Sequence, residues 1–218
     1  MNNLHPSWSK LFTDLNLFDQ INNLLIKAYS SNDIVFPKQD NVLNLFKLSD
    51  LNNIKVVIIG QDPYHDFNQA NGIAFSSSHI KTPASLKNIF KELESDLNIN
   101  HFNNNSLENW VKQGVFLINT IWTVVAHKPG SHTNLGWEKI TKKILEQIIL
   151  NNENVIFCLW GNFAIKMYDS LLVKSKFVFK SAHPSPLSYN KGFKNSKPFS
   201  KINNLLINQN STPIDWSL

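Results

Sequence analysis

Four short polar segments of the chain carry side chains that could bind a substrate and act on it. Residues 60–65 (GQDPYH) combine an amide, a carboxylate, a phenol and an imidazole, and residues 181–188 (SAHPSPLS) contain a second imidazole, His183. The other two segments are residues 119–120 (NT) and 160–162 (WGN). Carboxylates and imidazoles commonly stabilise charge or transfer protons in enzymes. Taken singly, each of these residues has an ordinary structural explanation, such as a turn, a helix cap or a buried histidine.

Each polar segment follows, at once or after one residue, a short apolar run that is typical of a buried β-strand. The runs are residues 55–59 (KVVII), 115–118 (VFLI), 155–159 (VIFCL) and 177–179 (FVF). In an open α/β sheet, ligands bind beyond the carboxyl ends of the strands. We therefore expect the four polar segments to meet at one edge of the sheet.

Helical spacing of apolar residues alternates with these runs. Predicted helices begin after a possible N-cap at Ser85 and near Trp137, and two more cover residues 162–172 and 197–208. At least one further helix is expected near the N-terminus. Strands that alternate with helices predict the α/β class. We expect a single three-layer α/β/α domain over residues 1–218, with a central, mainly parallel four-stranded sheet.

The composition indicates a folded, intracellular protein. Hydrophobic residues make up 42% of the 218 residues and charged residues 17%, which is typical of a chain with a full core. The single cysteine, Cys158, excludes a disulfide framework and a cysteine-ligated metal cluster. The sequence has no apolar run long enough to span a bilayer, and its N-terminus lacks the pattern of a secretory signal. A cytoplasmic location is expected.

The net charge of +5 favours an anionic partner such as nucleic acid, because basic side chains release counterions from phosphates. All 21 basic residues are lysine, a bias that we attribute to an A- and T-rich genome rather than to function. Phosphate contacts must therefore come from lysine, hydroxyl groups and backbone N–H groups instead of arginine.

The polar segments together resemble the family 1 uracil-DNA glycosylases, and bacterial members most closely. The resemblance rests on GQDPYH at residues 60–65, Phe75 in AFS, Asn119 in LINT and HPSPLS at residues 183–188. Further similar segments run almost to the C-terminus: residues 131–132 (SH), 135–138 (LGWE), 160–161 (WG) and 212–216 (TPIDW). The resemblance implies an enzyme that releases uracil from DNA and leaves an abasic site, the first step of base excision repair.

By similarity, Asp62 and His183 are the catalytic residues. Asp62 orients water and favours the positive charge that develops on the sugar, and His183 donates to uracil O2, as a neutral imidazole. The backbone N–H of Gln61 helps His183 on the side of the departing base. His65 is a weaker candidate for a residue that supports these groups. The resemblance implies no cofactor, metal or covalent nucleophile.

Three side chains are expected to recognise the flipped-out base. Phe75 resembles the family's stacking platform, and Asn119 the residue that reads O4 and N3–H of uracil. Tyr64 stands against C5 and leaves no room for the methyl group of thymine. This steric exclusion matters because thymine has the same polar edge as uracil.

The resemblance also implies residues that contact the DNA strand. Leu187 enters the stack that the base vacates, and the hydroxyls of Ser85 and Ser185 bind phosphates. His132 is assigned to the DNA side, and Lys191 is a weaker candidate for a backbone contact. The implied enzyme is a monomer that acts on single- and double-stranded DNA, and a DNA-mimicking inhibitor protein is a further expected partner.

The chain departs from the family pattern at several places. Asp66, Phe67 and Asn68 replace the usual Gly-Pro-Gly turn, and Asn162 replaces a serine after Trp-Gly. The segments before Ser85 and at residues 189–192 are also atypical. Two alternatives stay open. One is another branch of the glycosylase superfamily, with mismatch or broader base specificity, and the other is a non-catalytic DNA-binding or scaffold protein that kept the fold.

Overall fold

Four parallel strands form the central sheet of the computed structural model, which describes residues 3–102 and 104–217. In spatial order they are β3 (Val115–Asn119), β2 (Val56–Gly60), β5 (Ile156–Trp160) and β6 (Phe177–Ser181). All residues of the two central strands are buried, as expected for apolar runs in a sheet that is covered on both faces. The predicted α/β class and the parallel four-stranded sheet are confirmed.

The register of the strands brings their carboxyl ends to one level. Gly60 at the end of β2 pairs with Asn119 at the end of β3. Trp160 at the end of β5 pairs with Ser181 at the end of β6. The segment that follows each strand therefore leaves the sheet at the same edge, as the sequence predicts.

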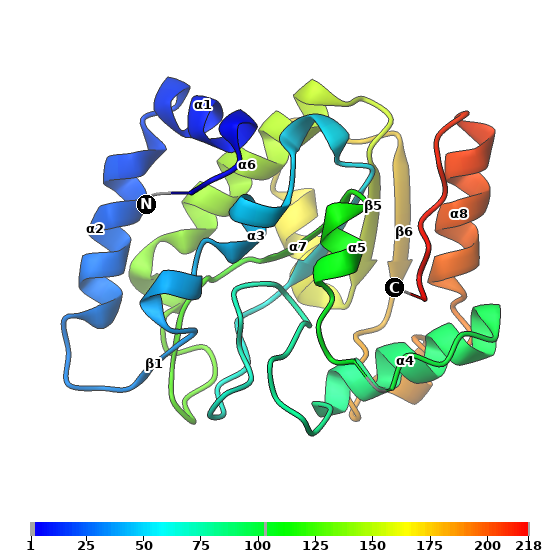
Figure 1. Ribbon diagram of the computed structural model, residues 1–218, viewed down its shortest axis with the longest axis horizontal. Coiled ribbons are helices and arrows are strands. Elements are labelled where there is room, and N and C mark those ends of the chain that lie inside the picture. The colour runs from blue at the N-terminus through cyan, green and yellow to red at the C-terminus, as the bar shows by residue number, and fades with distance from the viewer. Residues whose placement is uncertain (1–2, 103, 218) are drawn as a thin grey trace.

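Helices flank the sheet on both faces (Figure 1). They are α1 (Pro6–Asp14), α2 (Leu17–Tyr29), α3 (Asn44–Leu48), α4 (Ala84–Leu97), α5 (Glu108–Lys112), α6 (Trp137–Asn151), α7 (Asn162–Asp169) and α8 (Pro198–Asn208). A small antiparallel pair of strands, β1 (Val35–Phe36) and β4 (Val124–Val125), was not predicted. No helix in the described part of the chain is long and apolar enough to cross a membrane.

Two of the predicted helix boundaries need correction. Ser85 is not the N-cap of α4, because Pro83 takes the cap position and Ser85 lies within the first turn. The ψ of Pro83 is 152°, so the residue stands just outside the helix, and its carbonyl accepts the first helical hydrogen bond, from the N–H of Lys87 at 2.8 Å. The helix predicted for residues 162–172 ends earlier, at Asp169.

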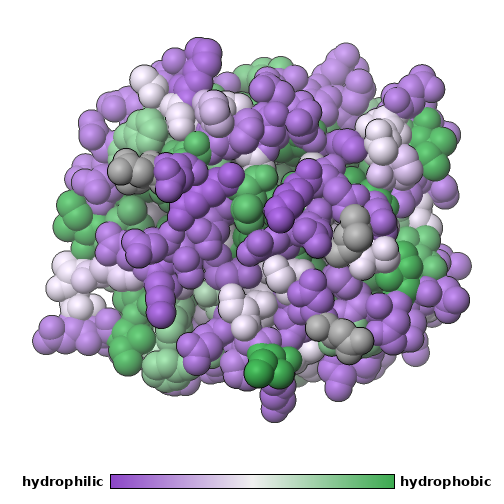
Figure 2. All heavy atoms as spheres, viewed as in Figure 1, coloured by the Kyte–Doolittle hydropathy of each residue, from purple (hydrophilic) through white to green (hydrophobic). Residues whose placement is uncertain are grey.

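Buried aromatic residues join the C-terminal segment to the rest of the core. Trp216 packs edge-on against Trp110 and Phe199, with ring centroids 5.0 and 5.1 Å apart. The indole N–H of Trp110 donates to the carbonyl of Trp216 at 3.2 Å. On the surface, hydrophobic side chains are scattered between polar ones on the face shown in Figure 2.

Two carboxylates of α4 hold the start of α8. Glu92, which is fully buried, accepts from the backbone N–H groups of Asn195 and Lys197 at 2.8 and 2.9 Å. One turn later, Asp96 accepts from Ser200 N–H at 2.9 Å. A helix N-terminus favours negative charge, so this contact fixes α8 against α4.

We expect Glu92→Ala to lower the free energy of unfolding by about 2–3 kcal/mol, because two backbone N–H groups lose their charged acceptor and the buried carboxylate leaves a gap. Urea unfolding followed by circular dichroism measures the change. Glu94→Ala is the matched control, since Glu94 lies on the same helix and is exposed. Equal stability of the two variants would contradict this account of the α4–α8 contact.

Candidate active site

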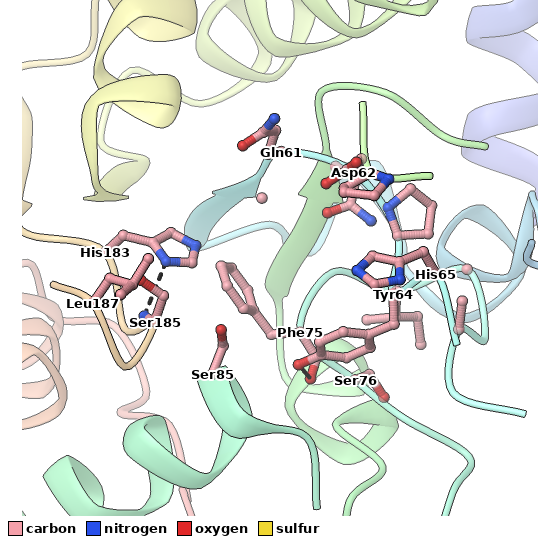
Figure 3. A pocket seen from close by; sticks show the side chains of 17 residues that line it. Gln61, Asp62, Tyr64, His65, Phe75, Ser76, Ser85, His183, Ser185 and Leu187 are labelled. Carbon is pink, nitrogen blue, oxygen red and sulfur yellow. Dashed lines mark hydrogen bonds between the residues drawn. The ribbon is translucent and has the colours of Figure 1, made fainter. Parts of the chain in front are cut away.

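A cavity of about 550 Å³ opens at the carboxyl edge of the sheet, where the four strand ends meet. Its walls come from the segments after β2 and β6, from Asn119 at the end of β3, from the start of α4 and from residues 70–76. Nine of the ten predicted site residues line it: Gln61, Asp62, Tyr64, Phe75, Ser85, Asn119, His183, Ser185 and Leu187. The exception is His132. His183 and Leu187 lie on one side of the cavity, and Asp62, Tyr64 and His65 lie on the other (Figure 3).

The Asp62 carboxylate is held by a backbone group that the sequence did not reveal. Its Oδ2 accepts from the N–H of Gly130 at 2.7 Å. Burial raises the pKa of Asp62 above its usual value, while the Gly130 hydrogen bond and nearby His65 act in the opposite direction. Pro129, from the same loop, lines the cavity. A backbone donor in a loop has no side-chain signature, so no sequence pattern could have identified it.

The hydrogen bonding of His183 determines which ring nitrogen carries the proton. Its Nδ1 accepts from the backbone N–H of Ser185 at 3.0 Å (Figure 3). A neutral imidazole has one N–H, so the proton of neutral His183 lies on Nε2. Burial lowers the pKa of His183, which favours this neutral form. The side chain therefore presents a neutral N–H donor.

The loop that carries His183 and Leu187 is braced from two directions. Ser188 Oγ donates to the carbonyl of His183 at 2.9 Å and is 2.8 Å from Ser185 Oγ. From α4, the buried amide of Asn88 donates to the carbonyl of Pro184 at 2.8 Å. Leu187 projects from this loop with 85% of its surface exposed. A large apolar side chain is thus held in solvent by a fixed backbone.

Glycines at two strand ends make room for site residues. A Cβ on Gly60 would lie 2.2 Å from Asn119 Oδ1, so only glycine lets the amide occupy its position. A Cβ on Gly161 would lie 2.7 Å from the Cβ of His183, and the φ of Gly161 is +90°. The close packing of neighbouring strand ends therefore depends on both glycines.

Tyr64 and Phe75 support one another at the cavity wall. The hydroxyl of Tyr64 donates to the carbonyl of Phe75 at 3.1 Å. Phe75 has a φ of +63°, an uncommon value for a bulky residue, and its ring packs against Trp160 and His183 at 5.3 and 5.8 Å. Burial raises the pKa of Tyr64, so its hydroxyl stays protonated.

The structure does not bring His132 to the cavity. Its side chain is buried, and its Nδ1 lies 2.8 Å from Thr123 Oγ1, which in turn accepts from the indole of Trp137. The contact of His132 with DNA stays a prediction. Asn162, where the family has serine, is exposed at the first position of α7.

Comparison with known proteins agrees with the fold and identifies the family. The family model described as the uracil DNA glycosylase superfamily matches residues 46–207. A relative from Listeria innocua, named uracil-DNA glycosylase 1, is 45% identical over 84% of each chain. A uracil-DNA glycosylase from Amoebophilus asiaticus is 43% identical over 98% of this chain and 99% of its own.

Among solved structures, mimivirus uracil-DNA glycosylase superposes with a TM-score of 0.90 and 28% identity. The superposition covers 98% of this chain and 87% of the viral one. The fold and the cavity thus define an α/β protein whose candidate active site lies at the carboxyl edge of a parallel sheet. The chain belongs to the uracil DNA glycosylase superfamily.

We expect Asp62→Asn to stabilise the fold at neutral pH, because burial raises the pKa of this carboxyl above its unfolded value. The ionised carboxyl then raises the free energy of the native state, and this cost reaches its full size only above the native pKa. The advantage of the variant should shrink as the pH falls toward 3.8.

Thermal melting of both proteins from pH 8 to pH 4 measures this difference. Asp14→Asn is the control, because Asp14 is an exposed carboxylate on α1. A variant that is less stable than the wild type at neutral pH would show that the Gly130 hydrogen bond outweighs burial.

Proposed function

We propose that this chain hydrolyses the N-glycosidic bond of flipped-out deoxyuridine in single- and double-stranded DNA. Uracil is released and an abasic site remains. The observation that carries the proposal is the cavity in which a half-buried carboxylate, Asp62, and a neutral imidazole, His183, line opposite walls (Figure 3). Its volume of about 550 Å³ lies in the usual range for small-molecule sites.

The two catalytic candidates match the two charges that develop as the bond breaks. The departing uracil becomes negative, and the Nε2–H of His183 is a donor for its O2, to which the backbone N–H of Gln61 adds a second donor. The sugar becomes positive, and the Asp62 carboxylate is an anion that stabilises it and orients water. The Gly130 N–H favours the ionised carboxylate that this role requires.

The residues that line the cavity between Asp62 and His183 determine which base is accepted. Asn119 accepts from uracil N3–H and donates to O4, whereas cytosine presents the opposite pattern. The amide has room for this because Gly60 has no side chain. Phe75 supplies a ring on which the base stacks, and Tyr64, hydrogen-bonded to the Phe75 carbonyl, excludes the methyl group of thymine.

Residues around the opening of the cavity bind the DNA strand. Exposed Leu187 enters the gap left by the flipped base, and the bracing of its loop supports this wedge. Ser185 and Ser85 contribute hydroxyls to phosphates, and the first turn of α4 around Ser85 adds the positive end of a helix. The basic net charge of +5 supports binding to DNA in general.

We further propose that the protein acts as a single-domain monomer in the cytoplasm, with no cofactor. One continuous cluster of buried hydrophobic residues, which extends from Leu4 to Trp216, supports the single domain. A mimivirus relative with a TM-score of 0.88 has been solved in complex with UGI, an inhibitor protein. That complex supports the proposal that a DNA-mimicking inhibitor protein binds this chain.

We expect the purified protein to release uracil alone from matched oligonucleotides that contain U, T or C, in the presence of EDTA. His183→Gln should slow the release by about 10²–10³-fold, because a donor to the leaving group is removed. His79→Gln is the matched control, since His79 Nδ1 also accepts a backbone N–H two residues along, but outside the cavity. Failure of the wild type to release uracil would favour the scaffold alternative, and equal loss of thymine would favour a broader branch of the superfamily.

We expect Asn119→Asp to release cytosine, because a protonated carboxyl can donate to N3 and accept from the C4 amine of that base. Tyr64→Ala should instead admit thymine and leave cytosine untouched. Chromatography of the released bases measures both specificities. A folded Asn119→Asp variant without detectable cytosine release would refute the edge-reading role of Asn119.

A further inference from the structure

Two histidines and an aspartate form a compact cluster beside the cavity. Asp66 Oδ1 lies 3.5 Å from His65 Nδ1 and 3.1 Å from His127 Nδ1. The three ligand atoms all lie within 4.8 Å of one another. Asp66 is one of the residues by which the sequence departs from the family pattern, so the cluster does not follow from the resemblance.

The backbone holds the cluster together. The N–H of His127 donates to the carbonyl of His65 at 2.9 Å, which ties the two loops where the side chains meet. His127 has a φ of +58°, an uncommon conformation outside glycine and asparagine. The ring of Phe67 packs against His127 and Phe36, with centroids 5.5 and 5.3 Å apart. The ligand atoms are therefore positioned before anything binds.

The hydrogen bonding of the cluster is incomplete. The Nδ1 atom of His65 is shielded from solvent and has no hydrogen-bond partner among the described residues. It nevertheless faces Asp66 Oδ1, which His127 already shares. A shielded ring nitrogen without a partner costs free energy, and a cation between the three groups would satisfy it.

We propose that His65, Asp66 and His127 bind a divalent transition metal of the zinc type. Metal–ligand bonds of about 2.0–2.2 Å in tetrahedral geometry separate neighbouring ligand atoms by about 3.3 Å, close to the two distances to Asp66. Two imidazole nitrogens favour Zn²⁺ and similar ions over Mg²⁺ and Ca²⁺, which prefer oxygen ligands. Water completes the coordination, because all three side chains are partly exposed.

The metal would join two loops that also shape the catalytic cavity. His65 lines the cavity, and the loop that begins at His127 supplies Pro129 to its wall and the Gly130 N–H to Asp62. A bound ion therefore clamps the loop that orients the proposed catalytic carboxylate. This clamp is a structural role, and uracil release itself does not require it.

The test uses the full chain, stripped of metal and titrated with Zn²⁺ by calorimetry and with Co²⁺ by visible absorption. We expect one strong site, with affinity lowered about tenfold or more in Asp66→Asn and in His127→Gln. Asp33→Asn is the charge-matched control, because Asp33 is an exposed carboxylate that pairs with Lys128 instead of a histidine. Its affinity should stay within about twofold of the wild type.

Thermal melting gives a second readout, because a metal that binds only the native state raises the melting temperature. At the same Zn²⁺ concentration, the increase should be alike for the wild type and Asp33→Asn and clearly smaller for Asp66→Asn. If a variant fails to fold, NMR of the histidine rings in the wild-type protein serves as the test. Zn²⁺ should shift the ring signals of His65 and His127 and leave those of His79 unchanged. No binding, equal binding by Asp66→Asn and wild type, or shifts confined to other histidines would overturn the proposal.

Discussion

The alignment of strand ends in the parallel sheet is the constraint on which the rest of the site depends. Gly60 and Asn119 are register partners, and so are Trp160 and Ser181. Because all four strands run the same way, the segments after them leave at a common edge. The cavity is therefore assembled from chain segments that are more than a hundred residues apart. Without this register, the same residues would lie in loops that do not meet.

Several features around the cavity are unfavourable for stability. Asp62 is a carboxylate whose burial disfavours its charge, and Phe75 has a backbone conformation that bulky residues rarely adopt. Leu187 exposes a large apolar surface. The surrounding structure maintains each of them, through the Gly130 N–H, the Tyr64 hydroxyl and the braced 183–188 loop. Such strain is commonly concentrated where proteins bind and act.

Much of the fold could be predicted because its signals are local. The four strands are short apolar runs, each followed by a polar segment, and their predicted bounds agree with the structure to within two residues. Helix ends were less certain, since Pro83 rather than Ser85 takes the cap position of α4. His132 was assigned to the DNA side, which stays a prediction, and the structure places its buried side chain beside Thr123, outside the cavity. A histidine in a loop carries no sequence signal for which way it points.

The sequence alone determined the α/β class, the family and the residue types that could break a glycosidic bond. Those properties follow from apolar periodicity and from short motifs whose residues are adjacent in the chain. Only the tertiary structure decided which nitrogen of His183 carries the proton, and that the backbone of Gly130 holds Asp62. It also decided that His127 meets His65 and Asp66. These are contacts between distant segments, and they depend on distances of a few ångströms that no spacing in the chain encodes.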